Sequence, residues 1–566
     1  MDQNKKVVII GGNACGMKTA ARLRRRDSAS KITVFEKGSF ISYGSCGFPY
    51  YISGAVQDYH SLIGGAGSVR DEAYFEAVKG VKVITEREAT LIDRENKEIE
   101  VLNLKTGAST RHAYDVLVIA TGGTPSQPKI KGIEGTAGVF TVTAMNEIIS
   151  IRKYIEKNNV KEVIVSGGGF IGVEVAETLK EKDLFVTIIK KSDKILPALF
   201  DEEISLLIAK YMEEKGVRII TGDEIAEVIS SDKGLLKRII TEKGKELSAG
   251  ILLVTKGFVP NAGLAKDAGL ECGESGAIRV NSHMQTSAPD IYAGGDCVEC
   301  THLVTGKKMT LALGSLANLQ GRVIADCIAG DDAVFPAVPC TAIFKIFNYT
   351  ACRTGITEKE AKELGYECVS AIVPGPDKPS FYPGVKHVIT KLIVDKKTKK
   401  ILGAQILGPG EAAKRMEIAA TAITCGATVD KLSMLNLAYS PPYSPPIDNI
   451  INAANAVINK LKGLAEGRSP VEVMKKFKAG DDFIYLDVRS EEEFNRMRID
   501  HPKVMLLPLG KLRKEGSNLP KDKEIIVSCM SSLRAYEGCV ILRAMGYEKV
   551  FFMDGGLMAW PYRLSI

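Results

Sequence analysis

The fold of this chain is decided at residues 5–37, which read KKVVIIGGNACGMKTAARLRRRDSASKITVFEK. An apolar, β-branched run leads into a glycine-rich turn, a helix-forming segment and a second apolar run, a pattern typical of strand, helix and strand. Residues 161–190, KEVIVSGGGFIGVEVAETLKEKDLFVTIIK, repeat that plan. Two such units predict two nucleotide-binding α/β domains.

The first glycine turn departs at one position from the usual Gly-x-Gly-x-x-Gly pattern, because Asn13 stands at the middle glycine. Gly11 permits the tight turn and Gly16 lets the helix pack closely on the strand. Asparagine tolerates unusual backbone angles better than most residues. Glu36 ends the second strand, where a carboxylate accepts hydrogen bonds from a ribose. The turn therefore predicts a dinucleotide with its pyrophosphate at the helix N-terminus, against the alternative of an ordinary glycine turn in an α/β domain.

The second glycine turn carries the complete pattern through Gly167, Gly169 and Gly172. Lys190 and Lys191 end its second strand, where an NAD-binding domain usually has a carboxylate. A cation cannot accept the ribose hydroxyl protons, but it attracts the 2′-phosphate of NADP. We therefore expect NADPH, or the use of both nicotinamides. The alternative is a solvated lysine pair with the ribose held by other groups.

The composition excludes several classes of protein. The chain has 566 residues, of which 45% are hydrophobic and 25% charged, as in ordinary globular proteins of several domains. A net charge of +7 over this length is too dilute to indicate nucleic acid. The 12 cysteines occur at ordinary density, and no apolar run is long enough for a membrane helix. We expect a cytoplasmic protein with reduced thiols that binds no nucleic acid, no membrane and no metal.

Four motifs resemble those of a known family. They are ISYGSCGFPYYISG at 41–54, ATGGTP at 120–125, GGGFIGVE at 167–174 and IYAGGD at 291–296. They are similar to motifs of the FAD-dependent pyridine nucleotide-disulfide oxidoreductases, in the single-cysteine branch of coenzyme A-disulfide reductases and NAD(P)H-dependent persulfide reductases. The resemblance covers residues 5 to about 450. It implies an enzyme that uses FAD and NAD(P)H, binds coenzyme A in some members, and acts as a homodimer.

The resemblance, together with the strand and helix patterns, predicts an α/β chain with four domains. The expected ranges are 1–150 and 251–330 for the two parts of a Rossmann-like FAD-binding domain, 151–250 for a Rossmann-like NAD(P)H-binding domain, 331–450 for an α+β dimerisation domain, 451–470 for a linker, and 471–566 for a C-terminal rhodanese α/β domain.

The resemblance also assigns cofactor contacts. The aspartate of the GGD motif, Asp296, is expected on the ribityl chain of FAD, and Phe170 is expected as a gate over the flavin. The complete set of expected cofactor-binding residues is Gly11, Asn13, Ala14, Gly16, Glu36, Lys37, Thr121, Gly122, Asp296, Gly167, Gly169, Phe170, Gly172, Glu174, Lys190, Lys191 and Gly257.

Cys46 is the expected redox thiol. Its neighbours are small and carry no acid that would oppose a thiolate. Two-cysteine reductases place a second cysteine five positions later, where this chain has Tyr51. A lone thiolate forms a mixed disulfide, a persulfide or a sulfenic acid. Relatives that use sulfenic acid carry a histidine in the first glycine turn, where this chain has Ala14, so we favour disulfide or persulfide chemistry. Cys15 is expected to be an inert buried cysteine.

In the family, tyrosines of the partner subunit's dimerisation domain border the reactive cysteine. The matching candidates are Tyr382, Tyr439 and Tyr443, each of which could instead be a core tyrosine.

Two departures from the family's motifs concern the binding of coenzyme A. Ser45 replaces an asparagine of close relatives, and SLIGGAGSVR at 61–70 is unlike the usual stretch in contact with coenzyme A. The residues therefore support the thiol chemistry more directly than they support coenzyme A as the ligand.

The C-terminal stretch contains a second reactive-cysteine candidate. The loop from Cys529 to Arg534 follows a buried strand and precedes a helix, so its backbone N–H groups are expected to cradle an anionic sulfur, with Arg534 adding positive charge. Together with LDVR at 486–489 and MDGGLMAW at 553–560, it resembles a rhodanese domain. A catalytically inactive rhodanese is the alternative.

These inferences converge on one reaction. NAD(P)H is expected to reduce a persulfide, polysulfide or coenzyme A disulfide at Cys46 through FAD, while Cys529 carries sulfane sulfur as a persulfide. The alternatives are an NAD(P)H oxidase or peroxidase that uses a sulfenic acid on Cys46, and a sulfur carrier whose flavoprotein half only scaffolds the rhodanese.

Overall fold

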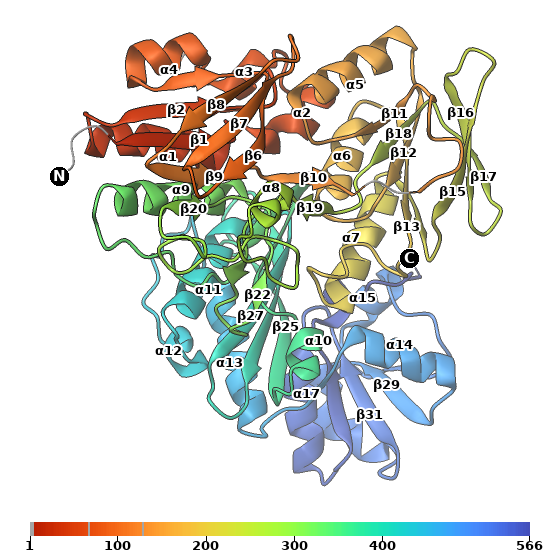
Figure 1. Cartoon of the computed structure of the whole chain (residues 1–566). Helices are drawn as coiled ribbons and strands as arrows, with labels where there is room; N and C mark the ends of the chain where they lie inside the picture. The colour runs from red at the N-terminus through yellow and green to blue at the C-terminus, as the bar shows by residue number, and fades with distance from the viewer. Residues whose placement is uncertain (1–4, 66–67, 127–128, 566) are drawn as a thin grey trace. The chain divides into compact units, whose positions relative to one another are not determined.

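The computed structural model describes residues 5–65, 68–126 and 129–565, and the chain divides into two compact units (Figure 1). The first unit comprises Met1–Gly167, Thr178–Ile189 and Glu224–Val338, and the second comprises Gly168–Glu177, Lys190–Asp223 and Pro339–Ile566. Residues 151–250 thus contribute to both units. None of the described helices is both long and apolar enough to span a bilayer.

The first unit contains a five-stranded parallel sheet in the order β20-β9-β1-β2-β5. Its strands are β1 (Lys6–Ile10), β2 (Lys31–Phe35), β5 (Lys82–Ile84), β9 (Val116–Ile119) and β20 (Ile291–Ala293). The strand β20 comes from the range 251–330 and pairs with β9 from the range 1–150. The two parts predicted for the FAD-binding domain therefore share one sheet.

Helix α1 (Ala14–Arg26) follows β1 and packs on α9 (Gly314–Ile328). The Thr19 hydroxyl donates to the Gly321 carbonyl at 3.1 Å, and a Cβ on Gly321 would lie 2.5 Å from the Cys15 carbonyl oxygen. The absence of a side chain at Gly321 thus allows the two helices to approach closely.

The first unit also holds a second set of parallel strands. They are β11 (Val139–Thr141), β18 (Ile251–Val254), β12 (Glu162–Ser166) and β13 (Phe185–Lys190), paired in that order. Two antiparallel meanders complete the unit, made of β6 (Arg87–Asp93), β7 (Glu98–Asn103) and β8 (Ser109–Ala113), and of β15 (Ile225–Ser230), β16 (Leu236–Thr241) and β17 (Glu246–Ser248).

The second unit contains a five-stranded antiparallel sheet in the order β23-β24-β27-β26-β25. Its strands are β23 (Ala342–Ile346), β24 (Tyr349–Gly355), β25 (Cys368–Pro376), β26 (His387–Asp395) and β27 (Ile401–Gly408). The helices α11 (Ala412–Thr424) and α13 (Asn449–Leu461) pack on it. The predicted linker is therefore mostly helical, since α13 covers its first half.

The C-terminal domain of this unit is built on a parallel sheet in the order β28-β32-β31-β29-β30. Its strands are β28 (Gly467–Arg468), β29 (Phe483–Asp487), β30 (Val504–Leu506), β31 (Glu524–Ser528) and β32 (Val550–Met553). Its helices include α14 (Pro470–Ala479), α15 (Glu491–Arg496), α16 (Leu509–Glu515) and α17 (Leu533–Ala544).

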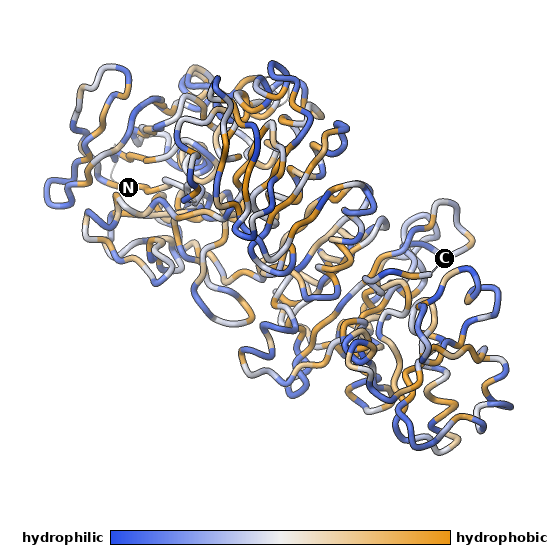
Figure 2. Tube along the Cα trace, turned by 90° about the vertical axis from the view of Figure 1, so that its right-hand side faces the viewer, coloured by the Kyte–Doolittle hydropathy of each residue, from blue (hydrophilic) through white to orange (hydrophobic). Residues whose placement is uncertain are grey.

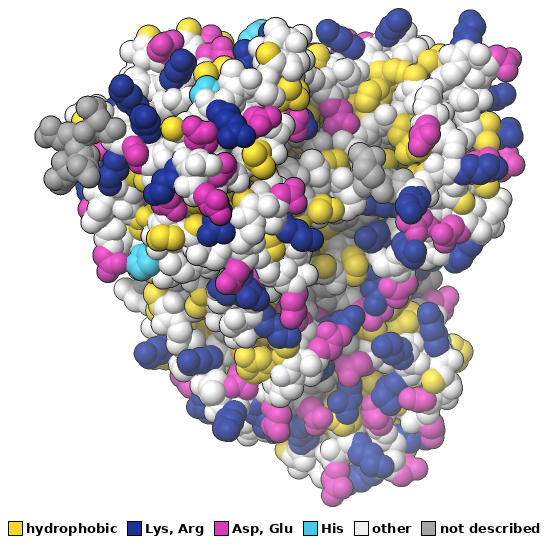
Figure 3. All heavy atoms as spheres, in the orientation of Figure 1, with side chains coloured by type: hydrophobic (Ala, Val, Ile, Leu, Met, Phe, Trp, Pro, Cys, Tyr) yellow, Lys and Arg dark blue, Asp and Glu magenta, His cyan; other side chains and the backbone are white. Residues whose placement is uncertain are grey.

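Hydropathy follows this arrangement. The strands of the sheets are traced mainly by apolar residues and the connecting loops mainly by polar ones (Figure 2). Basic and acidic side chains are interspersed over the face drawn in Figure 3, without a patch of one sign. This distribution agrees with the dilute net charge of +7.

Candidate active site

The first glycine turn has the geometry of an anion site. Gly11 has φ +111°, and a Cβ there would lie 2.1 Å from the Ala120 carbonyl oxygen. A Cβ on Gly16 would lie 2.0 Å from the Gly11 carbonyl oxygen, so both glycines are sterically required. The backbone N–H groups of residues 13–16 donate to no acceptor among the described residues. These free donors at the start of α1 fit a pyrophosphate.

Asn13 does not use the conformational tolerance that the sequence suggested. Its backbone is extended, with φ −113° and ψ −155°, which any residue can adopt. Its side chain caps nothing, and its Oδ1 is buried without a hydrogen-bond donor among the described residues. An unsatisfied buried acceptor is costly unless a bound group supplies the donor. What distinguishes Asn13 is therefore its buried side-chain oxygen, which is available to a bound donor, and not its backbone.

Two carboxylates flank this turn. Glu36 accepts the N–H groups of Gly12 and Gly38, each at 2.6 Å, which fixes the carboxylate at the end of β2. Asp296 follows β20, and burial raises the pKa of its carboxyl group. Asp296 makes no hydrogen bond or ion pair with another described residue. A half-buried carboxylate without a protein partner fits the hydroxyl groups of a ribityl chain, so the residues present fit FAD.

Two of the other expected cofactor contacts, Thr121 and Lys37, already have protein partners. The Thr121 hydroxyl donates to the Asn261 carbonyl at 2.6 Å, and the exposed Lys37 forms an ion pair with Glu88 at 2.7 Å. Gly122 and Gly257 both have positive φ, and no atom lies within 4 Å of a Cβ built on Gly122. These turns are open enough for a ligand, but the Thr121 hydroxyl group donates its hydrogen bond within the protein.

The second glycine turn repeats the anion geometry. Gly167 has φ +127°, and a Cβ there would lie 2.7 Å from Thr255, whereas a Cβ on Gly169 meets nothing within 4 Å. The backbone N–H groups of residues 168–172 lack an acceptor among the described residues. Helix α6 (Phe170–Lys180) starts here and includes Glu174. Open space at the middle glycine fits a nicotinamide dinucleotide.

The other residues expected at the nicotinamide site lie within the second unit. The half-buried Phe170 ring packs edge to face against Phe344, with ring centroids 5.3 Å apart. Lys190 ends β13 and is half-buried, and Lys191 follows it on the surface.

Cys46 lies on an exposed turn of the first unit. It is the central residue of the short 3₁₀ helix Ser45–Gly47, which leads into α2 (Phe48–Ile52). The turn is tied down by the N–H group of Gly44, which donates to the Leu62 carbonyl at 2.8 Å. A Cβ on Gly47 would lie 2.4 Å from a Leu62 methyl carbon. The thiol is therefore accessible on a rigid turn.

Cys46 has no resolving cysteine at the expected place. Tyr51 occupies that position and is buried, and the Arg152 guanidinium lies 4.9 Å from its ring centroid. All twelve cysteines are free thiols. Burial raises the pKa of the Cys15 thiol, which keeps it protonated and unreactive.

The loop after β31 is the candidate second sulfur site. Cys529 is buried, and the N–H groups of residues 530–535 donate to no acceptor among the described residues. Ser532 adopts a left-handed conformation with φ +83°, which turns the chain from the loop into α17. A Cβ on Gly556 would lie 2.5 Å from the Cys529 carbonyl oxygen. A row of unused donors beside a cysteine is the cradle that an anionic sulfur requires.

The positive charge of Arg534 beside this loop is compensated by an ion pair. Its guanidinium makes two hydrogen bonds of 2.7 Å to the carboxylate of Glu493. The ion pair lowers the pKa of Glu493 to about 2. Glu493 also closes a capping box with Ser490 at the start of α15. The positive charge expected to stabilise an anionic sulfur is thus neutralised by Glu493, an acid that the sequence pattern did not reveal.

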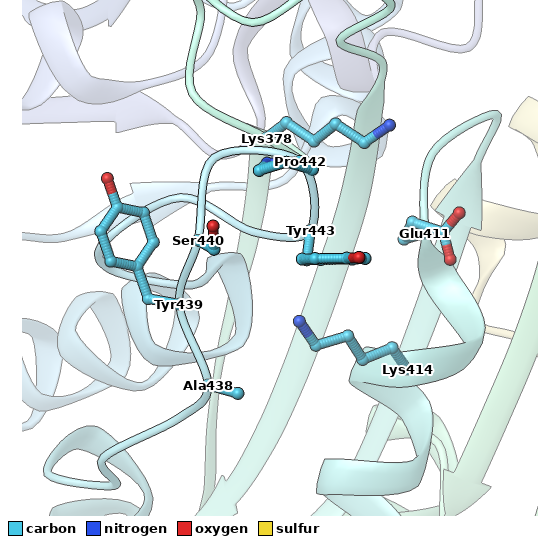
Figure 4. Close-up of a pocket in the computed structure, with 8 residues that line it drawn as sticks. All are labelled: Lys378, Glu411, Lys414, Ala438, Tyr439, Ser440, Pro442 and Tyr443. Atoms are coloured by element: carbon cyan, nitrogen blue, oxygen red, sulfur yellow. The ribbon is translucent and has the colours of Figure 1, made fainter.

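Two of the three expected tyrosines line one cavity. Tyr439 and Tyr443 lie in the proline-rich segment after α12 (Val429–Ser433) and border a cavity of about 590 Å³ (Figure 4). Tyr382 lies beside it, since the Lys378 ammonium group of the cavity wall is 6.0 Å from the Tyr382 ring centroid. Tyr439 and Tyr443 are 50% and 69% exposed, so neither is a core residue.

Sequence reasoning missed several residues around these sites. Lys378, Glu411 and Lys414 line the tyrosine cavity, and Glu493 pairs with Arg534. None belongs to a motif, because each meets its neighbours only after distant segments fold together. Ala66 and Gly67, within the segment expected near coenzyme A, lie outside the described residues. No group of three or more histidine, cysteine, aspartate or glutamate side chains suited to a metal occurs among the described residues.

Two dinucleotide turns and an exposed cysteine define the class of nucleotide-dependent thiol oxidoreductases. Comparison with known families agrees. Residues 5–320 match the pyridine nucleotide-disulphide oxidoreductase family, residues 341–450 match its dimerisation domain, and residues 469–561 match the rhodanese-like domain. The chain belongs to the pyridine nucleotide-disulphide oxidoreductase family, and it is an oxidoreductase that uses FAD and NAD(P)H. The family and fold predicted from the sequence motifs are confirmed.

Two curated relatives are named for reactions of sulfur compounds. The NAD(P)H sulfur oxidoreductase (CoA-dependent) of Pyrococcus furiosus is 33% identical over 455 residues, which cover 80% of this chain and 99% of the relative. The coenzyme A disulfide reductase of Staphylococcus aureus is 28% identical over 446 residues, which cover 79% of this chain and 98% of the relative. Each alignment leaves about a fifth of this chain uncovered.

Two solved structures match nearly the whole chain. An NAD-dependent persulfide reductase from A. fulgidus has a TM-score of 0.93 and 44% identity, with coverage of 98% of this chain and 100% of that one. The reduced CoADR-RHD of Bacillus anthracis has a TM-score of 0.91 and 32% identity, with 98% coverage of both chains.

Proposed function

We propose that this enzyme reduces the sulfur–sulfur bond of a persulfide, polysulfide or coenzyme A disulfide with NAD(P)H, and that Cys46 is the thiol that attacks that bond. The observation that carries the proposal is a lone, exposed thiol on a rigid turn, with a buried tyrosine in place of the resolving cysteine. Without an internal partner, the sulfur on Cys46 must come from the substrate.

The chemistry balances for a persulfide RSSH. The Cys46 thiolate attacks the outer sulfur and forms a Cys46 persulfide, while the bond to the inner sulfur breaks and RSH leaves. Two electrons from NAD(P)H then cleave the new sulfur–sulfur bond, which restores the thiolate and releases hydrogen sulfide. The sum is RSSH + NAD(P)H + H⁺ → RSH + H₂S + NAD(P)⁺.

The chain's own groups prepare this reaction. The free N–H donors of residues 13–16, together with Glu36 and Asp296, would hold FAD, and those of residues 168–172 would hold the nicotinamide cofactor. When bound, FAD couples the two-electron chemistry of the nicotinamide to thiol chemistry. Lys190 supports the use of NADPH, because a half-buried cation at the end of β13 attracts a 2′-phosphate.

We infer a homodimer in which Tyr382, Tyr439 and Tyr443 of one chain border Cys46 of the other. The matched dimerisation domain supports this arrangement. The segment that carries Tyr439 and Tyr443 also exposes Met434 at 83% and Ile447 at 54%, apolar area that a second copy would cover. Tyrosine hydroxyls there would donate hydrogen bonds to the leaving thiolate.

Cys529 would supply sulfane sulfur. The unused N–H groups of residues 530–535 support a persulfide anion on Cys529, which is the chemistry of a rhodanese domain. Persulfide carriers such as glutathione or coenzyme A would move this sulfur to Cys46. Coenzyme A itself is supported by relatives whose names include it.

The test is steady-state sulfide release from glutathione persulfide, coenzyme A persulfide and polysulfide, each with NADH and NADPH. The wild type should release sulfide in proportion to nicotinamide oxidised. C46S should lose release from every substrate, whereas C529S should keep release from preformed persulfides. Sulfide release that survives in C46S would refute the proposal and favour a sulfur carrier on a flavoprotein scaffold.

An oxidase reaction needs a separate test, because a relative from Methanocaldococcus jannaschii with 31% identity is named NADH oxidase. Oxygen consumption without a sulfur substrate, lost in C46S, would support a sulfenic acid on Cys46. We expect oxygen consumption to be slow beside sulfide release, since Ala14 stands where sulfenic acid relatives carry a histidine.

A further inference from the structure

The cavity beside the tyrosines is built from parts of the second unit that are far apart in sequence. Eight residues line it, and their side chains include two lysines, one acid and two tyrosines (Figure 4). They are Lys378, Glu411, Lys414, Ala438, Tyr439, Ser440, Pro442 and Tyr443. In Figure 4 the Lys414 ammonium group points toward Tyr443, while the Tyr439 hydroxyl points away from it.

Buried neighbours hold the two lysines in place. Lys378 follows Asp377, which is 2% exposed and accepts the N–H group of Lys386 at 2.8 Å. Lys414 precedes Arg415, which is fully buried and forms an ion pair with Asp448 at 2.9 Å. Because these anchors are buried and paired, the backbone at both lysines is fixed.

The positive charges of the cavity are not neutralised by acids in the part of the chain that the structure describes. Lys378 and Lys414 are half-buried, and neither forms an ion pair or hydrogen bond with another described residue. Glu411 is the one acid in the lining and pairs with neither lysine, so the lining has a net charge of +1. Lys414 lies in the first turn of α11, where a positive charge is unfavourable for the helix. The cavity thus holds two lysines that lack an acidic partner among the described residues, although the Lys378 ammonium group lies 6.0 Å from the Tyr382 ring centroid.

The tyrosine wall of the cavity is stiff. The Ser440 carbonyl accepts the N–H groups of Tyr443 at 2.9 Å and Ser444 at 3.1 Å. The Ser444 hydroxyl donates to the Ala438 carbonyl at 2.7 Å, and two prolines lie inside this turn. The hydroxyls and the ammonium groups are thus presented by a preformed surface.

We propose that this cavity recognises the oxyanionic tail of the thiol or persulfide carrier, a carboxylate or a phosphate, through Lys378 and Lys414. The inference rests on the proposed function, because it places the cavity beside the partner's Cys46. Charge-assisted hydrogen bonds from two ammonium groups on a fixed backbone select carriers with an anionic tail over uncharged ones. Glu411 sets a limit on the affinity, because its carboxylate repels the same tail.

The test compares three persulfides in the FAD-loaded enzyme. Glutathione persulfide carries carboxylates, coenzyme A persulfide carries phosphates, and the persulfide of 2-mercaptoethanol has an uncharged tail. In K378Q/K414Q the KM should rise about 10-fold or more for an anionic carrier, with kcat and the KM for the uncharged persulfide unchanged. E411Q should lower the KM for the anionic carrier. K400Q is the matched control, since Lys400 is exposed in the same domain and its removal should change nothing.

The measurements with glutathione persulfide and with coenzyme A persulfide show whether the cavity binds a carboxylate or a phosphate. A rise confined to glutathione persulfide assigns a carboxylate, and a rise confined to coenzyme A persulfide assigns a phosphate. Calorimetric titration of glutathione and coenzyme A should show the same loss of affinity without turnover. An unchanged KM for both anionic carriers, or an equal rise for the uncharged one, overturns the proposal. Either result leaves the proposed function intact, whereas a wild type that releases no sulfide from any persulfide refutes the proposed function instead.

Discussion

The ion pair between Lys460 and Asp554 offers a direct test of how the C-terminal domain is held on the antiparallel sheet of the second unit. Lys460 lies near the end of α13, and its ammonium group pairs with the carboxylate of Asp554 after β32. It also donates to the Ser370 carbonyl of β25 at 2.7 Å. Both side chains are only 10% exposed. One ammonium group therefore joins the two domains where water is nearly absent.

We expect K460M to destabilise this docking strongly. Removing one partner of a buried ion pair leaves an uncompensated charge and typically costs about 3–5 kcal/mol. Asp554 can relieve part of this cost by taking up a proton, because burial already raises the pKa of its carboxyl group. We therefore expect the lower figure, about 3 kcal/mol at neutral pH, or about 100-fold in the unfolding equilibrium of the domain.

The sign of the pH dependence follows from Asp554. Its folded pKa is raised above the unfolded value, so the folded state is stabilised at low pH, and that stabilisation is lost as the pH rises through the folded pKa. Removal of Lys460 raises the folded pKa further. The difference between K460M and the wild type should therefore be largest above neutral pH and should shrink as the pH falls toward 5.

The assay uses Trp560, the single tryptophan of the chain, which is 1% exposed in the C-terminal domain. Urea titrations followed by its fluorescence should give a lower midpoint for K460M, and K460M/D554N should recover most of the loss because no buried charge remains. K462M is the control, since Lys462 is exposed and makes no ion pair with a described residue. A midpoint for K460M equal to the wild type, or a double variant no better than K460M, would refute the reasoning.

Three further outcomes are expected. E493Q keeps the capping box of α15 but frees Arg534, so thiosulfate sulfurtransferase activity should rise several-fold; an unchanged or lower rate would show that the ion pair orients Arg534 for catalysis. K190Q should raise the KM for NADPH about 10-fold and leave that for NADH unchanged, and equal effects on both would exclude contact with the 2′-phosphate. The buried Lys391 lies within 2.9 Å of Glu358 and lowers its pKa, which gives stability that is complete above pH about 4.5 and is lost as the pH falls. The thermal midpoint should therefore fall in acid, and K391M should already have a reduced midpoint at neutral pH.

The sequence-based predictions that agree with the structure concern local backbone geometry. Gly11, Gly16 and Gly167 occupy places where a Cβ would collide with backbone or with Thr255, so short-range sterics determine both turns. The cysteine of the C-terminal loop precedes a row of unused N–H groups, as its position between strand and helix predicts. The explanation given for Asn13 was wrong in one respect, because its backbone is ordinary and its distinctive feature is a buried, unpartnered oxygen.

The sequence by itself determined the order of strands and helices, the geometry of the two glycine turns and the candidate thiols Cys46 and Cys529, because these depend on neighbours within a few residues. Only the tertiary structure decided the ion pairs between distant segments, such as the pair beside the Cys529 loop and the pair that joins the C-terminal domain to the antiparallel sheet. Arg534 meets Glu493 across 41 positions, and Lys460 meets Asp554 across 94. Such contacts depend on which helix packs against which strand. No local pattern shows which acid a given cation will meet, because the sequence contains many acids that could pair with it.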